Sequence, residues 1–161
     1  MLESASEFFV ATAGAAAALA GLIIVALSVS VDAIVRMPAM PARAGTAIAL
    51  LVVATLISLA GLIPEQSQLA FGVEVAVLAL AALCFAVLAL VRTVRGHGEF
   101  TVASAAVRGG LALVPAVLFL VGGVLVMAGE AAALPVLGIG MLLAIAVSVT
   151  TAWVVLVEIR R

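Results

Sequence analysis

The fold is decided by the stretch FFVATAGAAAALAGLIIVALSVSVDAIV, residues 8–35, in which Asp32 is the one charged side chain. At about 1.5 Å of rise per residue, a helix of this length crosses a hydrocarbon core roughly 30 Å thick. The stretch therefore predicts a membrane-spanning helix.

Small residues follow a regular order within this stretch. They recur at alternating steps of three and four, and a valine and two polar residues continue the series: Ala11, Gly14, Ala18, Gly21, Val25, Ser28 and Asp32. This spacing puts the residues on one helix face. Small side chains on such a face allow a second membrane helix to approach closely. We therefore expect helix packing along this face, here called the first-span seam.

The composition extends the membrane interpretation to the whole chain of 161 residues. It is 68% hydrophobic and 9% charged, whereas soluble domains have about 25% charged residues. So few charges would not cover the surface of a globule in water. The single cysteine excludes an internal disulfide, and the single histidine excludes a site with several histidines in one subunit. We expect one transmembrane domain without a metal or other cofactor.

Apolar runs separated by turn-forming residues predict an all-α, polytopic bundle of five spans, at about 8–35, 44–63, 69–91, 103–128 and 134–157. The segment MPAMP (37–41) contains two prolines and is predicted to break the chain between the first two spans. Pro115 predicts a kink in the fourth span, in the turn of Leu111. Pro135 suits an early position of the fifth.

Five spans would bring all seven arginines to one side of the membrane: Arg36, Arg43, Arg92, Arg95, Arg108, Arg160 and Arg161. The opposite side would hold five glutamates and no basic residue: Glu3, Glu7, Glu65, Glu74 and Glu130. Because arginines are enriched in cytoplasmic connections, this topology predicts an outside amino terminus and a cytoplasmic carboxyl terminus.

Two further spans carry small-residue faces. In the second span, Ala47, Ala54 and Gly61 repeat every seven residues. In the fifth, every fourth residue is small: Gly140, Ala144, Ser148 and Ala152. A chain of five helices is expected to bury about two such faces internally, which leaves one for a partner. The leading hypothesis is therefore a non-enzymatic assembly or regulatory subunit, packed with copies of itself or with another membrane protein. The few arginines flank apolar spans, so nucleic-acid binding is not expected.

Three carboxylates support a second hypothesis. Glu74, Asp32 and Glu7 would serve an oligomeric ion channel or small-ion carrier if they faced an aqueous path. Alternatively, Glu74 reaches water at the outer interface, and Asp32 pairs with Arg36 four residues later. We find no catalytic or nucleotide-binding motif, so we do not expect an enzyme.

Three segments together resemble a known group of proteins: FFVATAGAAAALAGLIIVALSVSVD (8–32), RMPAMPARA (36–44) and the Pro64-Glu65-Gln66 turn. They are similar to small integral membrane proteins of bacteria, mainly actinobacteria, that often carry the label "modulator of FtsH protease". The likeness covers roughly the first two spans. It implies a location in the bacterial plasma membrane and a membrane-bound protease as a partner.

Overall fold

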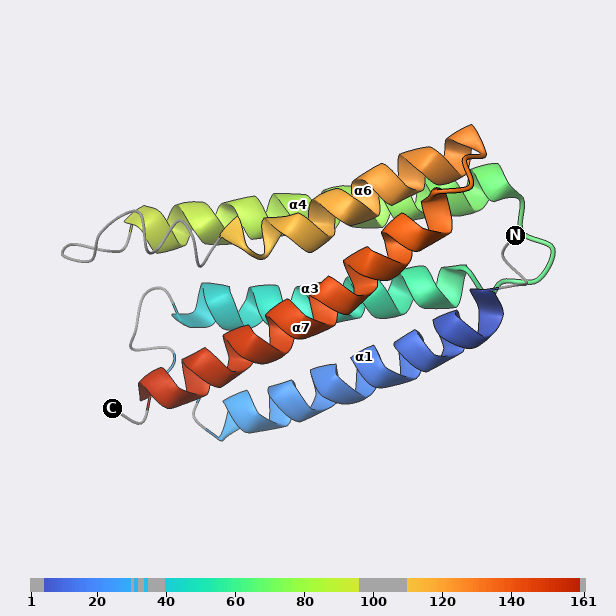
Figure 1. Cartoon of the computed structure of the whole chain (residues 1–161). Coiled ribbons are helices and arrows are strands. Elements are labelled where there is room, and N and C mark those ends of the chain that lie inside the picture. Colours follow the sequence, from blue (N-terminus) through green and yellow to red (C-terminus); the bar gives the residue numbers. More distant parts are fainter. Residues whose placement is uncertain (1–4, 30, 32–33, 35–39, 96–109, 160–161) are drawn as a thin grey trace.

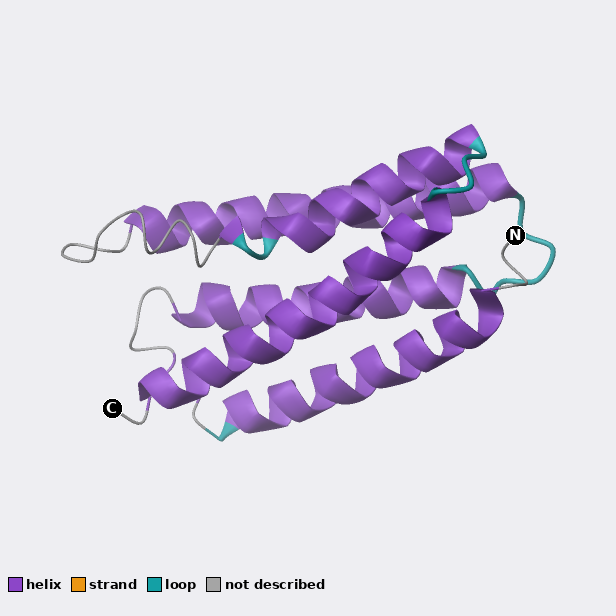
Figure 2. Cartoon of the chain, viewed as in Figure 1, coloured by secondary structure: helices purple, strands orange, loops and turns teal. Residues whose placement is uncertain are grey.

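The computed structural model describes residues 5–29, 31, 34, 40–95 and 110–159. Five helices cover most of these residues: α1 (Ser6–Ser28), α3 (Met40–Ala60), α4 (Gln68–Arg95), α6 (Leu113–Ala128) and α7 (Ala133–Ile159). The described residues contain no strand, as Figure 2 shows. The expectation of an all-α helical bundle is confirmed.

The helices form an elongated bundle with the two termini at opposite ends (Figure 1). Helix α4 packs beside α6, α3 lies between α4 and α1, and α7 crosses obliquely against α6 and α3. The short connections between α3 and α4 and between α6 and α7 lie at the amino-terminal end of the bundle, here called the acidic end. The acidic end holds Glu7, Glu65, Glu74 and Glu130, whereas Arg43, Arg92 and Arg95 belong to helix ends at the opposite, basic end.

Four of the helices, α1, α3, α4 and α7, are long and apolar enough to cross a membrane. Helix α6 is apolar but has only 16 residues. The predicted fourth span was longer, and its first part, residues 103–109, lies outside the described residues. The described residues therefore contain five helices, but the described part of α6 is shorter than the full span that the prediction requires.

The surface of the bundle is apolar along its length. Large side chains such as Leu22, Val77, Leu142 and Trp153 are at least half exposed. Soluble monomers rarely present continuous apolar surface on this scale. The protein is therefore a membrane-embedded helical bundle, with lipid as the solvent of these faces.

Several helix ends differ from the prediction. Helix α3 begins at Met40, four residues before the expected start at Ala44, and ends at Ala60. Pro41 consequently lies in the first turn of α3. Backbone N–H groups in the first turn have no intrahelical partner, so a proline there removes no hydrogen bond. The expectation that Pro41 belongs to a helix-breaking segment was wrong. Helix α1 ends at Ser28, earlier than the expected Val35.

The turns around α6 follow from glycine and proline. Leu111 and Ala112 form a turn just before α6, and Pro115 lies in the first turn of that helix. The chain is therefore interrupted at Leu111, where the sequence predicted a kink. At the other end, Gly129 has a φ of 75°, and the amides of Gly129 and Glu130 donate to Val126 and Leu125. This is a Schellman motif that ends α6. Pro135 then lies in the first turn of α7, as predicted.

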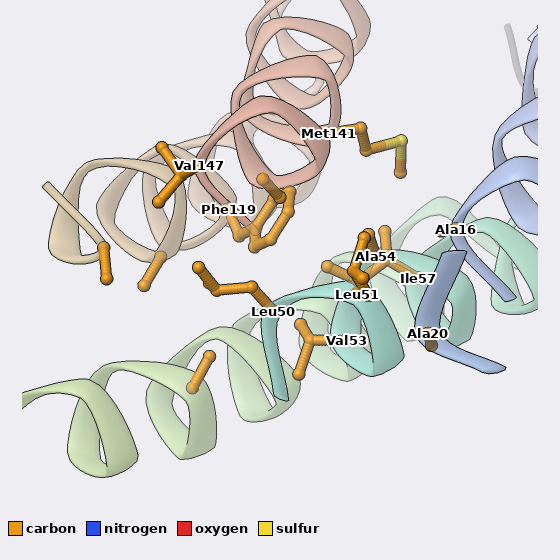
Figure 3. Packing of buried hydrophobic residues seen from close by; sticks show 14 of the residues in the cluster. Ala16, Ala20, Leu50, Leu51, Val53, Ala54, Ile57, Phe119, Met141 and Val147 are labelled. Atoms are coloured by element: carbon orange, nitrogen blue, oxygen red, sulfur yellow. The ribbon is translucent and has the colours of Figure 1, made fainter. Parts of the chain in front are cut away.

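The core is built where α3, α6 and α7 meet (Figure 3). Leu50, Leu51 and Ile57 of α3 are almost fully buried, as are Phe119 of α6 and Met141 of α7. In the last turn of α3, the Ser58 hydroxyl donates to the Ala54 carbonyl and lies 3.7 Å from the sulfur of Met141. At the acidic end, the side-chain amide of Gln68 donates to the Val126 carbonyl at 2.9 Å and ties α4 to the end of α6.

Candidate functional site

The first-span seam lies on the outer face of α1. The described residues of the seam, from Ala11 to Ser28, are exposed, and a Cβ added to Gly14 or Gly21 would meet no atom within 4 Å. The seam therefore does not pack within the chain, contrary to the simplest form of the expectation. Figure 1 shows α1 at the edge of the bundle, where one of its sides has no neighbouring helix.

A different face of α1 packs inside the bundle. Apart from Thr12, which adjoins Ala13, its buried residues are also spaced by three and four: Phe9, Ala13, Ala16, Ala20, Ile23 and Leu27. This face packs inside the bundle because it carries larger side chains than the first-span seam. Phe9, Ile23 and Leu27 are large and buried on this face, and the ring of Phe9 lies edge-on to Phe71 of α4, with centroids 6.0 Å apart. The first-span seam offers only small residues and one valine for the same contact.

The small residues of α7 lie in the interior. Gly140, Ala144, Ser148 and Ala152 are all buried, and a Cβ on Gly140 would come within 3.1 Å of the Phe119 ring. The hydroxyl of Ser148 is buried without a hydrogen-bond partner among the described residues. In the second span, Ala47, Ala54 and Gly61 are buried as well.

Sequence reasoning missed the small-residue contact between α4 and α6. A Cβ on Gly72 would lie 3.1 Å from the carbonyl oxygen of Gly123, and one on Gly123 would lie 3.2 Å from that of Gly72. The signal was present in the third span, where the buried residues again alternate in steps of three and four: Gly72, Val75, Ala79, Ala82, Ala86 and Ala89.

Glu74 lies in the second turn of α4, at the acidic end, and is partly buried. The side-chain amide nitrogen of Gln66 donates to its Oε2 at 2.7 Å. The local sequence fixes this pair. Glu65 has a φ of 55° in the turn after Pro64, and the Ser67 hydroxyl accepts the amide of Ala70 at 3.2 Å. Ser67 thus caps α4, so that Gln66 lies just before the helix and near Glu74.

Glu74 borders an apolar groove between α3 and α4, here called the Glu74 groove. One wall consists of Leu56, Leu59 and Ala60 with Ile63 just beyond α3. The other wall consists of Val73, Val77 and Leu78 beside Glu74 itself. The groove has a volume of about 960 Å³ with its open side included.

A second hollow lies next to this groove at the acidic end. It is lined by Ser6 of α1 and by residues 61–66 of the α3–α4 connection, so Ile63 borders both spaces. Gln66 lines the hollow and bonds Glu74, which lines the groove. The Gln66 Oε1 atom is buried and has no hydrogen-bond partner among the described residues.

The three candidate carboxylates have different surroundings. Glu7 is exposed in the first turn of α1, where a negative charge favours the helix dipole. Asp32 lies outside the described residues. In the part of the chain that the structure describes, no cluster of three or more histidine, cysteine, aspartate or glutamate residues could hold a metal ion. Of the two candidate carboxylates that the structure describes, Glu74 is the one with a side-chain hydrogen bond.

Comparison of the chain with protein-family models, with curated proteins and with solved structures finds no match. The function must therefore be argued from the two features just described, the first-span seam and the Glu74 groove.

Proposed function

We propose that this protein is a non-enzymatic membrane subunit that assembles with copies of itself through the first-span seam. The observation that supports the proposal is the open surface at Gly14 and Gly21, opposite the face of α1 that packs on α3. Helix association in lipid depends on close van der Waals packing, because lipid tails are as apolar as the helices. A stripe of alanine and glycine gains such packing from a second helix.

The remaining small-residue faces support the same assignment. Those of α3, α4 and α7 are already buried within the chain, so α1 carries the face that is left for a partner. Copies inserted with the same orientation present this face in parallel. A symmetric pair would then bring each residue of the seam close to the same residue of the partner.

The experiment is the mass of the purified protein in mild detergent. Gly14→Leu combined with Gly21→Leu replaces the open positions with bulky side chains, and we expect the assembly to dissociate while the helical content stays unchanged. Ala15→Leu is the matched control, because Ala15 is exposed on α1 but does not belong to the seam. A wild-type protein that is monomeric at all concentrations would contradict the proposal.

The topology belongs to the same proposal. We infer that the basic end faces the cytoplasm of a bacterial plasma membrane, since arginines favour that side. The resemblance of the first two spans to modulators of a membrane-bound protease would make such a protease a further partner. Co-purification of a protease with the wild type, and its loss with the Gly14→Leu and Gly21→Leu variant, would support a shared contact face.

A second candidate function is an oligomeric ion channel or small-ion carrier. The observation that favours it is Glu74, a partly buried carboxylate held by Gln66. Ion flux into proteoliposomes tests this function. We expect flux that depends on Glu74 if it is correct, so a Glu74→Gln variant with wild-type flux, or no flux at all, would contradict it.

A further inference from the structure

The Glu74 groove combines apolar walls with a single carboxylate. Seven of its eight lining residues are apolar, from Leu56 to Leu78. The walls belong to two helices with exposed apolar surfaces, including Leu59 and Val77. An occupant of such a groove would bury a hydrocarbon chain along the walls and present a polar group to Glu74.

The polar group at the end of the groove is a hydrogen-bond acceptor, so an occupant of the groove has to supply hydrogen-bond donors. Glu74 Oε2 already accepts the side-chain amide of Gln66, and the second oxygen of Glu74 has no hydrogen-bond partner among the described residues. Gln66 Oε1 belongs to the amide that bonds Glu74, and it is buried without a partner in the described part of the chain. Gln66 lines the neighbouring hollow and not the groove, so the acceptor that the groove offers to an N–H group is the Glu74 carboxylate. One carboxylate is too few for a bare divalent cation, which takes about six oxygen ligands.

The negative charge around the groove favours an occupant with a positive charge. Glu7, Glu65 and Glu130 lie at the same end of the bundle, while Arg43, Arg92 and Arg95 belong to the other end. A phosphate group would therefore meet like charges at the acidic end, and a cation would be attracted. A phospholipid with an ammonium headgroup brings its phosphate along, whereas a single-chain amine does not.

We propose that the Glu74 groove binds an amphipathic cation with a primary ammonium group and a single hydrocarbon chain. The ammonium donates to the Glu74 carboxylate, and the chain lies between α3 and α4. This site lies on a different face from the first-span seam and does not depend on the proposed assembly.

The test uses the full chain in phosphatidylcholine proteoliposomes and a dodecylamine probe that carries a photoreactive diazirine on its chain. After illumination, we expect peptide mass spectrometry to find the label within residues 56–78. Unlabelled dodecylamine should compete. Dodecyltrimethylammonium should compete less because it has no N–H group, and dodecyl phosphate should not compete.

The variants separate the site from general attraction of cations to the acidic end. Glu74→Gln should lower the labelling of residues 56–78 at least about tenfold, since a charge-assisted hydrogen bond is lost. Glu130→Gln removes one charge from the same end outside the groove and should leave the labelling unchanged. Val77→Trp keeps the carboxylate but fills the groove from an exposed position, so it should also lower the labelling.

Each variant is compared only after its circular dichroism and its elution in detergent match those of the wild type. Equal labelling of the wild type and Glu74→Gln, or labels spread evenly over all helices, would overturn the proposal. Competition by phosphatidylethanolamine as strong as that by dodecylamine would also overturn it, because the occupant would then be a phospholipid headgroup.

Discussion

Gly72 of α4 and Gly123 of α6 lie backbone against backbone. A Cβ on either residue would come within about 3.2 Å of the carbonyl oxygen of the other, closer than ordinary van der Waals contact. The two glycines let α4 and α6 run side by side, as Figure 1 shows. This contact positions Glu74, which lies two residues after Gly72.

We predict that Gly123→Ala destabilises the protein by about 1 to 3 kcal/mol, the usual cost of overpacking a tight contact. The added methyl group would meet the Ala76 backbone nitrogen at 3.0 Å, and backbone does not move aside as a side chain can. Unfolding in mixed micelles with increasing denaturing detergent, followed by circular dichroism, measures the change. Gly138→Ala is the control and should be neutral or slightly stabilising, because a Cβ there would meet only the Phe8 ring at an ordinary contact distance of 3.5 Å. Equal losses for both variants would contradict the account of the α4–α6 contact.

The neighbouring residues Phe8 and Phe9 should differ sharply in importance. Phe9 is 1% exposed and lies against Phe71, whereas Phe8 is 37% exposed. We expect Phe9→Ala to cost about 3 to 5 kcal/mol and Phe8→Ala considerably less. The same unfolding measurement checks this prediction. A larger loss for Phe8→Ala would mean that α1 packs through another face.

Ser67 and Ser28 provide a second matched pair. Ser67 accepts the Ala70 amide at the start of α4, where no carbonyl is available to that amide. Ser28 only donates to the Ile24 carbonyl of its own helix. Ser67→Ala should therefore cost about 1 kcal/mol, and Ser28→Ala should cost less. Hydrogen exchange of the first turn of α4 gives a local reading, and unchanged exchange in Ser67→Ala would show that the cap is unimportant.

The proposed topology is tested by labelling from outside the cell with a membrane-impermeant maleimide. Cys84 is replaced by alanine first, and single cysteines are then introduced as Glu65→Cys and Arg92→Cys. Glu65 lies in the connection at the acidic end and should be labelled in intact cells. Arg92 is exposed near the end of α4 and should be labelled only after the cells are opened. The reverse pattern would place the basic end outside.

The sequence predicted much of the architecture because lipid imposes long apolar segments. Pro135 and Gly129 mark real helix ends, since their backbone preferences act locally. The prediction for Pro41 was wrong because a proline breaks a helix in the helix interior but is tolerated in the first turn. The distinction depends on where the helix starts, which residue identity alone did not reveal.

The side of α1 that packs inside the chain was harder to predict. Two faces of α1 carry residues spaced by three and four, and both contain small side chains. The position of Phe9 against Phe71 and Gly61 decides between them, and this is a tertiary contact. The link between Gln66 and Glu74 likewise depends on the turn at Glu65 and the cap at Ser67, so spacing along the chain did not predict it.

The most direct test of the proposed assembly is a disulfide cross-link at Ala18, a residue within the first-span seam. In the background without Cys84, Ala18→Cys is oxidised in native membranes and compared with Ala15→Cys on the flank of the same helix. A disulfide requires Cα atoms within about 7 Å of each other, so only a residue at the contact between two copies forms one efficiently. We predict a dimer band for Ala18→Cys and little or none for Ala15→Cys. Absence of the band for Ala18→Cys, or bands of equal strength for both, would contradict assembly through this face.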